Sequence, residues 1–110
     1  MQIYYHAINL AFLNLMKNDQ DRTETKKMAE LALEHANKAA NDDMWEYATK
    51  AEAFLYLNDL NGALECYKKA IEISGQSIRE MNSMYMNAVF ACNALNKQAW
   101  QNDLLVIFNH

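Results

Sequence analysis

The sequence predicts an all-helical protein built from helical hairpins. The chain has no proline and only two glycines in 110 residues, so it favours long helices with short connections and lacks the residues that punctuate a sheet. Apolar residues recur at intervals of three and four, which is the spacing of one helix face. With 52% hydrophobic and 22% charged residues, the chain can bury a core as one domain over residues 1–110.

The clearest hairpin lies between Met44 and Gly75. The first helix has a small residue between two aromatic ones at helical spacing, namely Tyr47, Ala51 and Phe54, and the second repeats the spacing with Ala63, Tyr67 and Ala70. Small residues on a helix face let two helices approach closely. We expect the turn at residues 60–62, with the hairpin ending at Gly75.

This pattern resembles the tetratricopeptide repeat (TPR), a helical hairpin of about 34 residues that stacks into superhelices. The resemblance is clearest for residues 44–75 and less complete for residues 2–41 and 78–109. It implies an α-α solenoid of three hairpins and six helices. Lys50 stands where the family is usually apolar, so we expect its stem to lie along the groove with its ammonium in water.

The other elements follow the same logic. An apolar stripe predicts a first helix over residues 2–17, and a second is expected from about Thr23 to Ala40. Asp43 with Glu46, and Ser77 with Glu80, have the spacing that closes a helix N-terminus. The predicted hairpins therefore cover residues 2–40, 43–75 and 78–109.

The sixth helix is expected to run from Lys97 to Phe108, after a cap at Asn96. Ala99 would then take the place of Ala63, 36 residues earlier in the chain. That displacement is close to the repeat length of the family.

Charge and hydropathy exclude two classes of partner. The formal net charge is -4 and no run of lysines or arginines occurs, so we expect no nucleic acid, whose phosphates need clustered positive charge. No stretch approaches the ~18 uninterrupted apolar residues of a membrane span, and no secretory signal pattern is present. The sequence thus predicts a cytoplasmic protein, although an exported parent protein is also compatible with it.

No pattern in the chain points to catalysis, a metal or a cofactor. The three histidines, His6, His35 and His110, lack a glutamate at the spacing of a helical metal site. The two isolated glycines cannot form a phosphate-binding loop. Cys66 and Cys92 form no CxxC motif. We therefore predict a protein that is not an enzyme, with two cysteines that fill small gaps in the core.

The TPR resemblance implies a partner-binding concave face, lined by the first helix of each hairpin. Carried over residue by residue, this face would present His6, Leu10, Trp45, Thr49, Glu52, Tyr56, Met84, Tyr85 and Ala88. The carboxylate-binding lysines and asparagines of chaperone-binding relatives are replaced here by residues such as Ala48 and Glu52. The expected ligand is therefore an apolar peptide or partner helix that is neutral or basic.

The C-terminal helix predicts a second interaction. Residues 104–108 are five consecutive apolar residues, which must cover more than one side of a helix. Two compatible interpretations follow: the chain is an excerpt of a longer repeat protein, or it associates through this end with a partner or with itself, as a homodimer through Leu104, Leu105, Ile107 and Phe108. Three functions remain open: a protein-binding scaffold, a self-associating module and a peptide-sensing regulatory domain.

Overall fold

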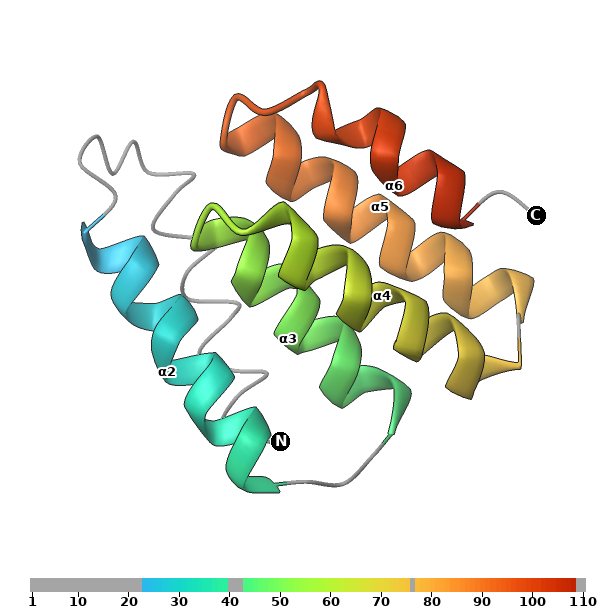
Figure 1. Ribbon diagram of the computed structural model, residues 1–110, viewed down its shortest axis with the longest axis horizontal. Coiled ribbons are helices and arrows are strands. Elements are labelled where there is room, and N and C mark those ends of the chain that lie inside the picture. The colour runs from blue at the N-terminus through green and yellow to red at the C-terminus, as the bar shows by residue number, and fades with distance from the viewer. Residues whose placement is uncertain (1–22, 40–42, 76, 109–110) are drawn as a thin grey trace.

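The computed structural model describes residues 23–39, 43–75 and 77–108, and every secondary-structure element in these ranges is a helix. These helices lie side by side in antiparallel order (Figure 1). They are α2 (Thr23–Ala39), α3 (Met44–Tyr56), α4 (Leu60–Ser74), α5 (Ile78–Ala94) and α6 (Trp100–Phe108). The all-α prediction is confirmed for this part of the chain.

The predicted helix boundaries are correct in places and wrong in others. The helix predicted over residues 2–17 lies outside the described residues, so five helices are described where six were predicted. The turn expected at residues 60–62 is instead the start of α4, and the chain turns at residues 57–59. The sixth helix begins at Trp100 rather than Lys97, because residues 97–102 make tighter i to i−3 backbone bonds first.

Side chains at the helix N-termini explain two of these boundaries. The Asp43 carboxylate accepts a hydrogen bond of 2.7 Å from the backbone N–H of Glu46, as its spacing predicted. Asp59 caps α4 in the same way, accepting from the N–H of Gly62 at 3.0 Å. This cap was not predicted, and it moves the turn towards the N-terminus. Ser77 stands at the N-cap of α5 but makes no capping hydrogen bond with its side chain.

The two hairpin turns after α3 and α5 have the same backbone structure. Asn58 and Asn96 both adopt left-handed conformations, with φ of 65° and 62°. In each turn the asparagine N–H bonds the carbonyl three residues back, and the next N–H bonds the carbonyl five residues back. This pair of bonds is the Schellman motif, which satisfies the last carbonyls of a helix. A Leu-Asn dipeptide thus closes both helices, 38 residues apart.

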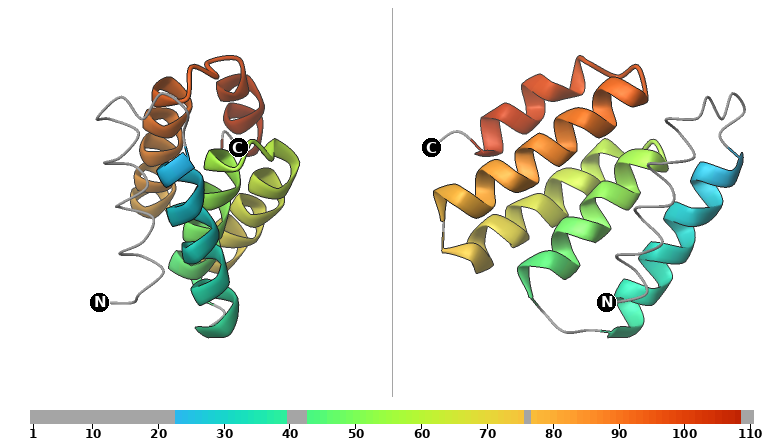
Figure 2. Two further views of the ribbon diagram at one scale, coloured as in Figure 1. Left: turned by 90° about the vertical axis from the view of Figure 1, so that its left-hand side faces the viewer. Right: turned by 180° about the vertical axis from the view of Figure 1, so that it is seen from behind.

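The helices form two layers. α3 packs against both α4 and α5, α4 packs against α6, and α2 covers the other side of α3. Two further views show the two hairpins α3–α4 and α5–α6 stacked next to each other (Figure 2). The molecule measures 37 × 31 × 21 Å, and its shortest dimension equals about two helix diameters of 10–12 Å.

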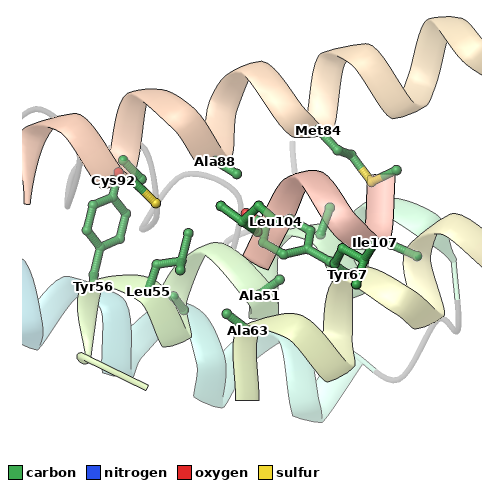
Figure 3. Close-up of a cluster of buried hydrophobic side chains, with 14 of the residues drawn as sticks. Ala51, Leu55, Tyr56, Ala63, Tyr67, Met84, Ala88, Cys92, Leu104 and Ile107 are labelled. Atoms are coloured by element: carbon green, nitrogen blue, oxygen red, sulfur yellow. The ribbon is translucent and has the colours of Figure 1, made fainter. Parts of the chain in front are cut away.

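Alanines line the contacts between helices. Ala51 of α3 and Ala63 of α4 are fully buried where these two helices pack (Figure 3). Ala70 of α4 is also fully buried. Tyr56, Tyr67, Leu55 and Met84 fill the remaining space as the largest buried side chains. Ala99 does not take the place of Ala63, because it is exposed in the turn before α6. The longer α5–α6 turn shifts the register of the last hairpin.

Lys50 does not extend into water as expected. Its ammonium lies 3.9 Å from the carboxylate of Glu46 and 4.9 Å from the centre of the Tyr47 ring. The Lys50 side chain is only 15% exposed and that of Glu46 only 1%. A lysine at this position is therefore stabilised by an opposite charge and an aromatic face one turn earlier on the same helix.

Because Asn58 adopts a left-handed conformation, its replacement by alanine should affect stability differently from the same replacement at the nearby Asn61. Asn58→Ala should lower the free energy of unfolding by about 1 kcal/mol, because alanine is strained at positive φ. Asn61→Ala, on the exposed side of α4, should leave it unchanged or raise it by about 0.5 kcal/mol, because alanine favours helix. Urea unfolding followed by circular dichroism measures both. Equal effects at the two sites would contradict the turn structure.

Candidate functional site

The candidate site is a small hollow on the face where α3 and α5 lie next to each other. Its volume is about 20 Å³, which is room for about one water molecule. Residues of α3, α4 and α5 line the hollow. The lining residues are Trp45, Ala48, Thr49, Glu52, Tyr67, Met84 and Asn87.

The structure brings together four of the residues predicted for the concave face. Trp45, Thr49, Glu52 and Met84 all line the hollow. Trp45 is 42% exposed, which is unusual for so large an apolar side chain, whereas Thr49 and Met84 are buried at its edges. Aromatic side chains with this degree of exposure are enriched at protein interfaces.

The other predicted residues lie elsewhere. Tyr56 and Ala88 are buried in the core, with exposed fractions of 1% and 0%. Tyr85 is half-buried, and its ring lies 5.5 Å from that of Phe108, so it faces α6. His6 and Leu10 lie outside the described residues. Among the described residues, the predicted face is therefore limited to the surface around Trp45.

Two lining residues were missed by the sequence analysis. Tyr67 matched a core position of the repeat pattern, and it reaches the hollow from α4. Asn87 is exposed on α5, three residues after Met84. A spacing of three places Met84 and Asn87 on one helix face. Asn87 could therefore have been predicted from its distance to Met84 in the sequence.

The Glu52 carboxyl, which lines the hollow, has a strongly shifted pKa. Burial disfavours its charged form and raises its pKa from 4.5 to about 7. The hydroxyl of Tyr56 donates a hydrogen bond of 3.3 Å to Glu52 Oε1, which opposes the shift only in part. Burial, with the Glu52 charge beside it, also raises the pKa of the Tyr56 hydroxyl. Glu52 therefore exchanges its proton near neutral pH while Tyr56 stays neutral.

The Glu52 carboxyl in the hollow can pair with a positive charge, but the hollow is too small for a small-molecule substrate. A carboxyl group with a pKa of about 7 accepts a hydrogen bond or an ion pair from a basic group when that group arrives. A space that holds one water molecule does not enclose a small-molecule ligand, since such pockets usually measure about 300–1,000 Å³. The arrangement suits contact with a surface side chain.

Metal and thiol chemistry have little support among the described residues. Within residues 23–39, 43–75 and 77–108, no three His, Cys, Asp or Glu side chains are grouped as metal ligands would be. Cys92 is buried and Cys66 half-buried, and both are free thiols. Loss of hydration raises the pKa of Cys92 to about 11 and that of Cys66 above its usual value, which makes both thiols poor nucleophiles.

The C-terminal apolar run divides between core and surface. Leu104, Ile107 and Phe108 are buried, and the Phe108 ring packs edge-on against Tyr67 at 5.4 Å. Leu105 is 47% exposed and Val106 is 74% exposed. Of the four residues predicted for self-association, only Leu105 therefore faces outward, because the other three pack against α4 and α5.

Comparison with known proteins found no matching family model, no matching curated protein and no matching solved structure. Among the described helices, none is both long enough and apolar enough to cross a bilayer.

The raised pKa of Glu52 predicts a stability that falls as pH rises. Between pH 4.5 and about 7 the folded carboxyl keeps a proton that the unfolded one has lost, so stability decreases across this range and then levels off. Glu52→Gln should therefore be more stable than the wild type above pH 7, by roughly 1–2 kcal/mol after allowance for partial solvation.

Chemical denaturation across this pH range measures the effect, and Glu65→Gln on the exposed side of α4 is the matched control. A stability difference between Glu52→Gln and the wild type that does not change with pH would contradict the raised pKa.

Proposed function

We propose that the protein is a non-catalytic interaction module of tetratricopeptide-like hairpins, which binds a protein segment at the face around Trp45. The observation that carries the proposal is the exposed Trp45 beside the half-buried Glu52, on the side of α3 that the TPR resemblance assigns to partners. Large exposed aromatic side chains are typical centres of protein interfaces.

Two features of the fold support the repeat assignment. The α3 and α5 helices end in the same left-handed Leu-Asn turn. α3 packs against α5 while α4 packs against α6, so the second hairpin repeats the first in space. In a repeat protein each unit buries its apolar side against the next unit, and this contact pattern is the one such stacking requires.

The chemistry of the site defines the partner segment. An apolar side chain would cover Trp45, and a lysine or arginine next to it would pair with Glu52. The protein carries an excess of acidic residues, 14 against 10 basic ones, so its overall charge also favours a basic segment.

Peptide selection tests this assignment. Peptides selected from a displayed random library against the whole chain should be rich in Lys or Arg beside an apolar residue. Trp45→Ala should weaken their binding by about tenfold or more, as loss of a central aromatic contact does. Val106→Ala, which removes an exposed apolar residue from α6, is the control and should leave binding unchanged.

The same peptides should bind more tightly as pH rises through the pKa of Glu52. If only the ionised carboxylate pairs with the basic residue, affinity should increase about tenfold between about pH 6 and pH 8. Glu52→Gln should remove this dependence. Isothermal titration calorimetry at several pH values measures both effects. Peptides that bind Trp45→Ala as tightly as the wild type would contradict the proposed binding site.

Self-association is a second candidate function, and a separate surface favours it. Met86 and Phe90 stand four residues apart on α5 and are each 51% exposed, while Val106 is exposed on α6. The buried Phe108 is unsuitable for testing this, because a charge there would unfold the chain.

Sedimentation at several concentrations tests the second candidate. A dimer formed through these residues should dissociate at least tenfold more readily in Phe90→Glu, because the charge must be desolvated at the interface. Ile78→Glu, at an exposed residue near the start of α5, is the control. A monomer at every concentration would rule out self-association, and this result would not bear on the proposed binding at Trp45.

A further inference from the structure

A separate cavity lies at the edge of the molecule where the hairpins turn. Figure 1 shows the beginning of α2, the α3–α4 turn and the α5–α6 turn along the same edge. The cavity between them has a volume of about 230 Å³. That is slightly below the usual range of ligand pockets and equals the liquid volume of about eight water molecules.

Two lysines from distant parts of the chain line this cavity. Lys26 comes from the first turn of α2 and Lys97 from the turn before α6. Neither makes an ion pair with a carboxylate among the residues that the structure describes, in contrast to Lys38 and Lys50, which do. No described acidic residue lines the cavity. Two lysines that no described carboxylate pairs with, at one concave site, favour an anion there.

The other lining residues are mostly apolar or aromatic, with polar groups on Tyr56 and Asn58. Leu55 and Leu95, both buried in the core, form part of the lining together with Trp100. The Lys97 ammonium lies over that ring, 5.6 Å from its centre. Asn58, held in its left-handed turn, adds a side-chain amide at the rim. Such a site offers an apolar surface and a cationic end to the same ligand.

We infer that this cavity binds a small organic anion, with its carboxylate or phosphate between Lys26 and Lys97 and its apolar part against Leu95 and Trp100. The apolar walls distinguish such a ligand from an inorganic ion, which would gain nothing from them. The cavity size limits the ligand to about the size of a substituted benzene ring. This site is separate from the surface around Trp45, because the two share no lining residue.

Nuclear magnetic resonance titration of the whole chain tests the inference. The probes are benzoate and phenyl phosphate, with neutral benzamide and inorganic phosphate for comparison. Benzoate or phenyl phosphate should shift the indole N–H signal of Trp100 in a saturable way and leave that of Trp45 unchanged. Lys26→Gln and Lys97→Gln should each weaken binding about fivefold, which corresponds to the loss of one charge pair.

Lys68→Gln, an exposed lysine on α4, is the matched control and should bind like the wild type. Circular dichroism confirms that each variant is folded. The inference is overturned if neither organic anion gives a saturable shift at Trp100, or if the two cavity variants behave like the control. Equal binding of benzamide or of inorganic phosphate would also overturn it, since one lacks the charge and the other the apolar part.

Discussion

The close packing of α3 against α4 is the contact on which the rest of the structure depends. Ala51, Ala63 and Ala70 are fully buried, and side chains this small let helix backbones approach closely while losing no rotamer entropy. The larger residues then fill the space beside this contact. Tyr67 reaches from α4 to the Phe108 ring of α6, 5.4 Å away, so the second hairpin rests on the first through aromatic packing.

Polar groups inside this packing are held by neighbours on the same helix. Within one turn of α3, the Lys50 ammonium lies 3.9 Å from the Glu46 carboxylate and 4.9 Å from the centre of the Tyr47 ring. Glu52 lies further along the same helix, where its carboxyl accepts a hydrogen bond of 3.3 Å from the Tyr56 hydroxyl. Burial raises the pKa of Glu52 to about 7, and the hydrogen bond from Tyr56 opposes this shift only in part. A buried carboxyl of this kind can pair with an incoming positive charge.

The hollow beside Trp45 and the cavity at the hairpin turns differ in shape and in charge. The hollow beside Trp45 is shallow and contains a carboxyl group, and it suits a side chain on a protein surface. The cavity at the hairpin turns is about ten times larger and contains two lysines. Both lie between the stacked hairpins, because the clefts of a stacked helical array form where neighbouring units meet.

Sequence alone determined the helical class, most helix boundaries and the close contact of Ala51 with the second helix of its hairpin. These features depend on local spacing and on the absence of proline, which act within a few turns of chain. It also indicated Trp45, Thr49, Glu52 and Met84 together, through the TPR resemblance.

The positions of Tyr56, Ala88 and the C-terminal apolar run could be decided only by the tertiary structure. Tyr56 and Ala88 match partner-facing positions, yet they are buried. The longer turn before Trp100 sets the rotation of α6, so it decides which of residues 104–108 face the core. The cavity between Lys26 and Lys97 joins residues 71 positions apart in the chain. Such a site depends on how three chain segments meet in space, and periodicity within one helix contains no information about that.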